Sequence, residues 1–231
     1  MLGVMRIGRS ACLAIAGLAL LPGQAAACAV ALAFALDVSA SVDSTEYALQ
    51  RDGLAEALED PVIRDAILAQ PGGVAFAAYE WSGRYQQDAM LDWTLVQSDE
   101  GISAVAGRIR AARRSYAEFP TAIGYALGHG AVLLSRAPPC LRRVIDISGD
   151  GIGNEGFGPA AAYREFAFED VTVNGLVIGG DDAALVEYYR REIPHGPGAF
   201  VEIAENFRDY GNAMRRKLLR ELFGPQVVAA P

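Results

Sequence analysis

The chain has 231 residues, of which 52% are hydrophobic, and a formal net charge of −8. This length and apolar content suit one α/β domain with a buried core and exclude a disordered chain. The acidic balance argues against nucleic-acid binding, because the basic stretches near Arg113 and Arg216 are short. We expect the stretch near Arg216 to be a solvated helix face.

Residues 1–27 have the organisation of an export signal. Arg6 and Arg9 precede an apolar run over residues 11–21, and three alanines before the next cysteine offer a cleavage site. Pro22 interrupts the run before it is long enough to span a membrane. We therefore expect a periplasmic or secreted protein with no membrane span after cleavage. Loss of the two arginines would take the net charge from −8 to −10.

Cleavage would remove Cys12 and leave Cys28 and Cys140. An even pair of cysteines in an oxidising compartment predicts a disulfide. Cys28 lies nine residues before Asp37 and Cys140 lies ten before Asp150, and each acid follows a predicted strand. If those strands are parallel neighbours, both cysteines lie at the opposite edge of the sheet. Two alternatives stay open: a lipid on Cys28, or two unpaired thiols.

Strand and helix signals alternate along the rest of the chain. Residues 29–36 form a continuous apolar run, which is typical of a strand buried on both faces of a parallel sheet. Alternating polarity over residues 86–96 predicts an edge strand antiparallel to its neighbour. Further strands are predicted over residues 74–81, 142–148, 171–179 and 199–204. Helices are predicted over residues 44–58, 62–68, 99–110, 121–135, 160–168, 184–192 and 207–222.

This order predicts a doubly wound α/β fold, with a mainly parallel central sheet and helices on both faces. The domain is expected to span residues 28–224, followed by a flexible tail over residues 225–231. In such folds ligands bind beyond the carboxyl ends of the strands. We therefore expect a binding site in the loops that follow the carboxyl ends of the strands.

Three loops at that edge carry oxygen donors without a histidine or a thiolate. The donors are Asp37, Ser39 and Ser41 in the first loop, Thr121 in the second and Asp150 in the third. Carboxylates and hydroxyls are the ligands of hard cations such as Mg²⁺. These residues are therefore predicted to bind a divalent metal and to leave one position for a partner's carboxylate.

The motif Asp-Val-Ser-Ala-Ser, with a distant threonine and an aspartate after a later strand, resembles the von Willebrand factor type A domain. The resemblance covers roughly residues 30–222 and includes a group of exported bacterial proteins of unassigned function. It implies a metal-ion-dependent adhesion site and a non-enzymatic module that binds an acidic side chain of a protein partner through the cation. The implied ligands are Asp37, Ser39, Ser41, Thr121 and Asp150.

Two acids near the motif have other expected roles. Asp43 is expected to cap the first helix rather than to bind metal. Asp146 lies inside a predicted strand, while Asp150 lies at its end, so Asp150 is the preferred ligand. Asp146 is expected to be structural, bonded to the loop over residues 113–119 or to an arginine.

The sequence also allows three functions other than metal-mediated binding. A metal-dependent hydrolase could use the same acids, but no nucleophile or zinc-protease motif is present, and His129 and His195 are expected to be packed and exposed, respectively. Residues 151–156 spell G-x-G-x-x-G, and Asp181 follows the next strand, as in a dinucleotide site. Asp150 would crowd the phosphates of such a ligand with negative charge. A structural envelope component with an empty site is a further alternative.

Overall fold

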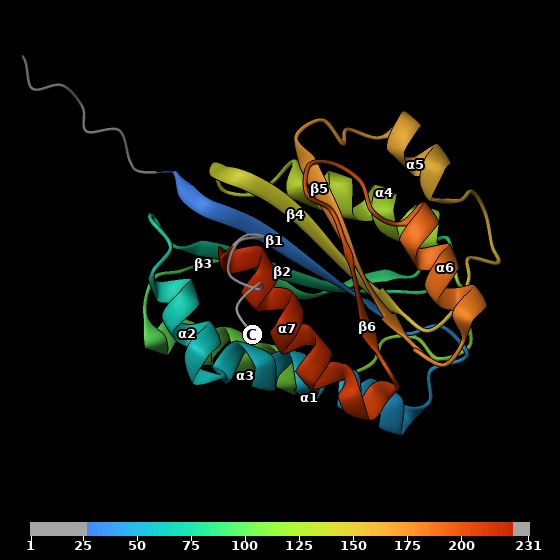
Figure 1. Cartoon of the computed structure of the whole chain (residues 1–231), viewed down its shortest axis with the longest axis horizontal. Coiled ribbons are helices and arrows are strands. Elements are labelled where there is room, and N and C mark those ends of the chain that lie inside the picture. Colours follow the sequence, from blue (N-terminus) through green and yellow to red (C-terminus); the bar gives the residue numbers. More distant parts are fainter. Residues whose placement is uncertain (1–26, 224–231) are drawn as a thin grey trace, which may run out of the picture.

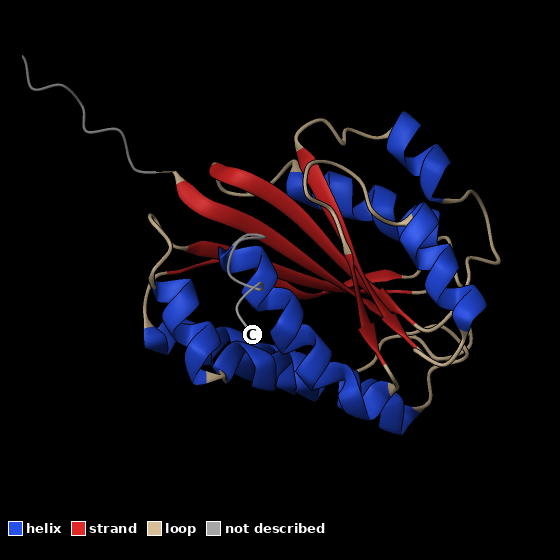
Figure 2. Ribbon diagram, viewed as in Figure 1, coloured by secondary structure: helices blue, strands red, loops and turns tan. Residues whose placement is uncertain are grey.

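Six strands form one sheet in the order β3-β2-β1-β4-β5-β6 in the computed structural model, which describes residues 27–223 (Figures 1 and 2). All neighbours are parallel except β2 and β3. The strands are β1 Cys28–Asp37, β2 Val74–Trp81, β3 Gln87–Val96, β4 Cys140–Gly149, β5 Val171–Ile178 and β6 Val201–Ala204. The predicted edge strand is thus confirmed as β3.

Helices cover both faces of the sheet, which confirms the predicted doubly wound fold (Figure 1). The helices α1, α2, α3 and α7 cover one face, and α4, α5 and α6 cover the other. Their bounds are α1 Ser44–Glu59, α2 Pro61–Leu68, α3 Asp99–Ala111, α4 Ile123–Leu134, α5 Pro159–Glu165, α6 Ala183–Glu192 and α7 Tyr210–Phe223, with a 3-10 turn at Phe207–Asp209.

Strand β1 is buried along its whole length, as its apolar run predicts. Its alanines at 31, 33 and 35 face the same core as α4. In α4, a Cβ on Gly130 would lie 2.7 Å from the hydroxyl of Tyr79 and 2.8 Å from Cδ1 of Ile145, so these side chains of β2 and β4 would have to move. Small residues on both sides therefore set the approach of α4 to the centre of the sheet.

A disulfide joins Cys28 and Cys140, which are the first residues of the neighbouring strands β1 and β4. The two residues are paired in register, with their Cα atoms 4.3 Å apart. This confirms the predicted disulfide. It also confirms the predicted placement of the cysteines, because the other ends of the same two strands carry Asp37 and lead to Asp150. The two ends of this strand pair thus carry the covalent link and the candidate site.

Some local expectations differ from the structure. Helix α5 ends at Glu165 rather than near residue 168, and α4 begins at Ile123 rather than at residue 121. His195 is half-buried and not exposed, because its ring stacks on Tyr163 at 4.4 Å between centroids. His129 packs against the ring of Tyr79, as expected.

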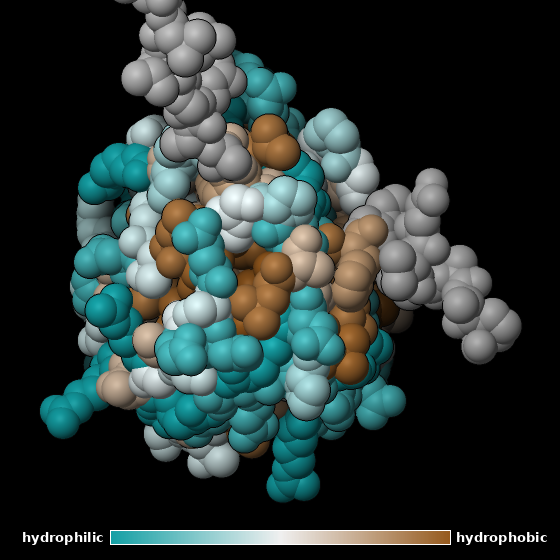
Figure 3. Space-filling model, turned by 90° about the vertical axis from the view of Figure 1, so that its left-hand side faces the viewer, coloured by the Kyte–Doolittle hydropathy of each residue, from teal (hydrophilic) through white to brown (hydrophobic). Residues whose placement is uncertain are grey.

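The predicted signal over residues 1–27, except its last residue, and the predicted tail over residues 225–231 lie outside the described residues. Within residues 27–223, no helix is long and apolar enough to cross a membrane. The face on the left of Figure 1, where β1 begins, carries apolar side chains grouped among polar ones (Figure 3). The candidate site lies toward the other end of the strands.

Candidate metal centre

Asp37 is the last residue of β1 and its side chain is fully buried. Oδ1 accepts a hydrogen bond from the backbone amide of Ser39 at 2.7 Å, which folds the chain into a tight turn after the strand. The side-chain amide of Gln50 in α1 donates to the Asp37 carbonyl at 2.9 Å. Oδ2 of Asp37 has no hydrogen-bond partner among the described residues. A buried carboxylate oxygen without a partner is costly unless a cation or a water binds it.

The hydroxyls of Ser39 and Ser41 lie 3.2 Å apart, as expected for alternate residues of this turn. Ser41 also donates to Oδ1 of Asp150 at 2.8 Å, across 109 residues of sequence. Ser39 is buried and Ser41 is exposed. The loops after β1 and β4 therefore meet, with the buried Asp37 and Ser39 beneath the exposed Ser41.

Thr121 lies two residues before α4 and is buried. The residue that caps α4 is Ala122, so Thr121 is not the helix cap. Its backbone amide donates to the side-chain oxygen of Asn154 at 2.9 Å, and its carbonyl accepts from the amide of Asn154 at 2.9 Å. The Thr121 hydroxyl lies 3.5 Å from the point that a Cβ on Gly151 would occupy. That hydroxyl therefore lies beside the residue that follows Asp150.

Gly149, at the end of β4, leaves space for the groups around Asp37. A Cβ there would lie 2.5 Å from the hydroxyl of Tyr189, 2.7 Å from Oδ2 of Asp37 and 3.2 Å from the ring of Trp81. The Tyr189 hydroxyl and the Trp81 indole nitrogen are also buried without partners in the described part of the chain. Two unpartnered oxygens, Oδ2 of Asp37 and the Tyr189 hydroxyl, thus lie around Gly149, where a cation with bound water would satisfy them.

The electrostatics of the site favour a cation. Burial and the nearby charge of Asp150 raise the pKa of Asp37 to about 7. Burial also raises the pKa of the Asp150 carboxyl. Both shifts mean that two negative charges are unfavourable in this place without a positive partner, and a bound cation would reverse them.

The nearby Arg114 does not donate to these two carboxylates. The guanidinium of Arg114 instead donates to the carbonyls of Val38 and Ser39, both at 3.1 Å. Ala40 donates to the carbonyl of Phe119 at 2.9 Å and so joins the first loop to the segment before Thr121. Backbone contacts therefore hold the turn in shape and leave the carboxylate oxygens available.

The neighbouring acids have the roles of caps and anchors. Asp43 caps α1 and forms a capping box with Glu46, as expected. Glu80 accepts from the hydroxyl of Tyr47 at 2.6 Å and from the amide of Ser115 at 2.8 Å. The loop over residues 113–119 is thus anchored by Glu80. The expected bond from Asp146 to that loop or to an arginine is wrong, because Asp146 contacts Lys217.

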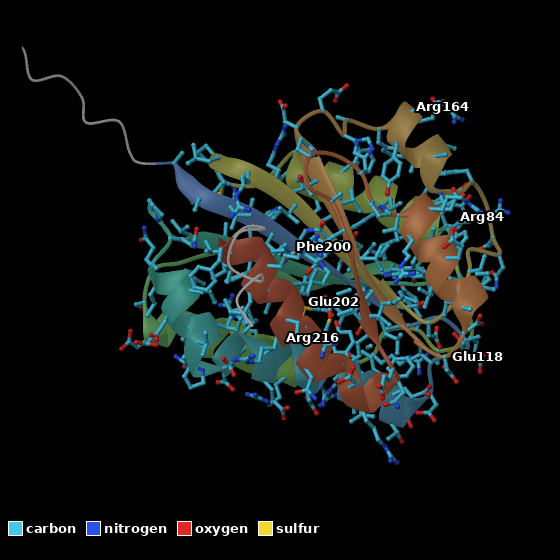
Figure 4. All side chains as sticks on the ribbon, viewed as in Figure 1. Arg84, Glu118, Arg164, Phe200, Glu202 and Arg216 are labelled. Carbon is cyan, nitrogen blue, oxygen red and sulfur yellow. A yellow bond between two sulfur atoms is a disulfide. The ribbon has the colours of Figure 1, made fainter. Side chains whose placement is uncertain are left out.

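The glycine-rich loop after β4 supports Thr121. Glu155 in that loop binds Arg84 at 3.2 Å, at the same end of the sheet as the site (Figure 4). Helix α5 begins only at Pro159, beyond the glycines. The loop therefore lacks the helix that would follow directly in a dinucleotide site.

The donor set contains two carboxylates and three hydroxyls. No group of three or more His, Cys, Asp or Glu residues that could hold a metal ion occurs within residues 27–223. A hollow of about 610 Å³ lies between α1 and α7 and is lined by none of the five predicted ligands. Sequence reasoning missed Gln50 and Tyr189, because their helical spacing indicates only packing.

The fold is similar to that of von Willebrand factor type A domains. Proximal thread matrix protein 1 from the mussel byssus has a TM-score of 0.63 and 16% identity, over 84% of this chain and 48% of that chain. A von Willebrand factor type A structure from Catenulispora acidiphila has a TM-score of 0.58 and 16% identity, over 85% of this chain and 43% of that chain. An aerotolerance-related membrane protein from Bacteroides fragilis has a TM-score of 0.56 and 15% identity, over 83% of this chain and 99% of that chain.

The chain belongs to the family described as "Protein of unknown function (DUF1194)", which matches residues 27–226. Comparison with curated proteins gave no match. The chain spans less than half the length of the mussel protein. Another structure of that mussel protein is described as having a zinc-occupied MIDAS motif. At these identities the solved structures establish the fold alone.

Proposed function

We propose that this domain binds a divalent cation between the loops after β1 and β4, and that the cation binds a carboxylate of a protein partner. The observation that carries the proposal is the buried Oδ2 of Asp37, which lacks a partner among the described residues beside the loop that carries Asp150. Mg²⁺ is the expected ion, because carboxylate and hydroxyl oxygens suit a hard cation.

We assign the five predicted residues different roles in binding the cation. The hydroxyls of Ser39, Ser41 and Thr121 are direct ligands, and Asp37 and Asp150 neutralise the ion directly or through its waters. Ser41 is exposed, so the open side of the ion lies above it. An acidic side chain from a partner would complete the coordination from that side.

An exported location fits this function. The disulfide between Cys28 and Cys140 is typical of a periplasmic or secreted protein. A disulfide also occupies the thiol that a lipid would need on Cys28. The neighbours by fold include a thread matrix protein and a pilus adhesin from Lactobacillus rhamnosus, which agrees with binding to another protein.

A metal-dependent hydrolase is the alternative, but no specific observation favours it. Such an enzyme needs a general base within reach of metal-bound water. His129 packs on Tyr79 and His195 packs on Tyr163, so both rings take part in aromatic packing. We therefore propose a non-enzymatic module.

Calorimetric titration of the chelator-treated protein with Mg²⁺ tests the metal site. Wild-type protein is expected to bind one ion, and Ser41→Ala is expected to weaken binding by about 10-fold or more. Asp43→Ser is the matched control, because it removes an acid from the same loop and keeps a residue that caps α1. Equal binding by wild type and Ser41→Ala, or no heat from wild type, would contradict the proposal.

Gly149→Ala is expected to weaken Mg²⁺ binding without removing any donor. The added Cβ would overlap Oδ2 of Asp37 and the hydroxyl of Tyr189, so both must move. The ring of Trp81 also lies beside Gly149. Its fluorescence should therefore change when Mg²⁺ binds, and the Trp93→Phe background removes the signal of the other tryptophan. Unchanged affinity in the alanine variant, measured by that signal, would place the ion elsewhere.

The partner step has its own test. Binding of a partner from envelope extract should require Mg²⁺, and both chelator and Asp37→Asn should abolish it. A partner that binds the Asp37→Asn variant as well as wild type would not use this site.

A further inference from the structure

A second cluster of charged groups lies inside the domain, between β4 and α7. The side chains of Lys217, Asp146 and Glu221 are 0%, 1% and 4% exposed. Nζ of Lys217 contacts Oδ1 of Asp146 and lies 2.7 Å from Oε1 of Glu221. The expected solvated face near Arg216 is therefore wrong at residue 217.

The cluster is held in a fixed arrangement. Lys217 and Glu221 are one turn apart on α7, and Asn174 in β5 donates to Oε1 of Glu221 at 2.6 Å. Asn174 is itself held by the amide of Phe200 at 3.0 Å. The ring of Phe200, which lies beside α7 in Figure 4, is 5.1 Å from Nζ of Lys217.

As an ionised group, this cluster is unfavourable. One lysine and two carboxylates give a net charge of −1 in a place without water contact. Oδ2 of Asp146 and Oε2 of Glu221 have no hydrogen-bond partner within residues 27–223. When buried charges lack further hydrogen bonds, their mutual attraction does not offset the free energy cost of removing them from water.

We propose that Lys217 and Asp146 are joined by an intramolecular amide bond, with Glu221 as the group that transfers the proton. Nζ of neutral Lys217 attacks Cγ of protonated Asp146. Glu221 takes a proton from the nitrogen and gives it to the departing hydroxyl, which leaves as water. The C–N bond replaces one C–O bond, Glu221 returns to its starting state, and no oxidant or cofactor is consumed.

Three features of the cluster promote this condensation. Burial lowers the pKa of Lys217 to about 8, opposed by the charge of Glu221, so the neutral amine is accessible. The contact between Nζ and the Asp146 carboxyl makes the reaction intramolecular, which raises its effective concentration. A hollow of about 120 Å³, lined in part by Asn174, Phe200 and Glu221, adjoins the site and can receive the water.

The composition of the chain also supports an amide bond at Lys217. Lys217 is the only lysine in the sequence, and every other basic side chain except the two histidines is arginine. Arginine stays protonated and is not a nucleophile in proteins. The single residue able to form such a bond is thus the one buried against Asp146.

The product would anchor α7 to the central sheet. The amide removes the charges of Lys217 and Asp146. It also links Asp146 in β4 to Lys217 in α7, which are 71 residues apart in sequence. Movement of α7 away from β4 would then require breaking a covalent bond.

Amine labelling of the denatured, reduced protein tests the bond directly. Because Lys217 is the sole lysine, wild type should be labelled only at its amino terminus. Its intact mass should fall short of the mass of the sequence by one water. Trypsin should give residues 144–164 joined to residues 217–220 as one branched peptide.

Variants identify the reacting groups. Glu221→Gln keeps the side-chain shape and should leave Lys217 open to labelling, with the full mass. Lys217→Arg should also have the full mass. Labelling of Lys217 in the wild-type chain, or a free peptide over residues 218–220 from the unlabelled digest, would overturn the proposal. The wild-type result decides it even if a variant fails to fold, and a branched peptide from Glu221→Gln would remove Glu221 from the mechanism.

Discussion

Asp37→Asn is expected to abolish Mg²⁺ binding while making the metal-free protein more stable at neutral pH. The substitution keeps the shape of the side chain and removes its charge. Loss of residues that only orient metal ligands costs 10- to 100-fold in affinity, so loss of a charged donor should cost about 100-fold or more. Calorimetric titration with Mg²⁺ measures this loss, with Asp43→Ser as the control.

The gain in stability follows from the pKa of Asp37. Burial and Asp150 raise this pKa from 3.8 in the unfolded chain to about 7 in the metal-free fold. The folded state therefore holds a proton that the unfolded state releases between about pH 4 and pH 7. Stability is fully present below pH 4 and is lost as the pH rises through 7, by about 4 kcal/mol for this difference in pKa.

Urea unfolding at pH 5 and pH 8 in chelator measures this dependence. Wild type should be less stable at pH 8, Asp37→Asn should lose most of that difference, and Mg²⁺ should restore wild type alone at pH 8 by binding the folded state. Equal slopes with pH in wild type and Asp37→Asn would show that Asp37 is not the group that titrates. A stabilising effect of Mg²⁺ on Asp37→Asn would contradict its role in the site.

Sequence periodicity was enough to predict the sheet, because its central strands are buried on both faces. The apolar run before Asp37 ends in a single acid, whereas the strand before Asp150 also contains Asp146, and only Asp150 lies at the strand end. Spacing also places Ser39 and Ser41 two residues apart on one turn. These are local sequence patterns. They predict that the loops lie at one edge of the sheet because the parallel sheet aligns the ends of the strands.

Contacts between distant residues could not be predicted in this way. Lys217 and Glu221, four residues apart on a helix, look like an exposed ion pair, and only the packing of α7 buries them. Thr121 looks like a helix cap, yet the helix begins after it because the loop with Asn154 holds its backbone. Tyr189 reaches the site from α6, with no motif to mark it.

Reduction of the disulfide between Cys28 and Cys140 is expected to cost about 4–5 kcal/mol of unfolding free energy. The bond joins residues separated by 112 positions in sequence. A disulfide that closes a loop of this size stabilises the fold by about 4–5 kcal/mol, because it lowers the conformational entropy of the unfolded chain. Urea unfolding with and without reductant measures the loss, and the Cys28→Ser/Cys140→Ser variant should match reduced wild type.

The same experiment separates the two covalent links in the domain. The disulfide closes residues 28–140 and the amide closes residues 146–217, so the two loops share no residue. Restrictions on separate parts of an unfolded chain add, since neither shortens the other's loop. Reduction should therefore cost the same in wild type and in Glu221→Gln, although the variant starts from a lower stability. A much larger loss in Glu221→Gln would mean that the two links stabilise β4 jointly in the folded state.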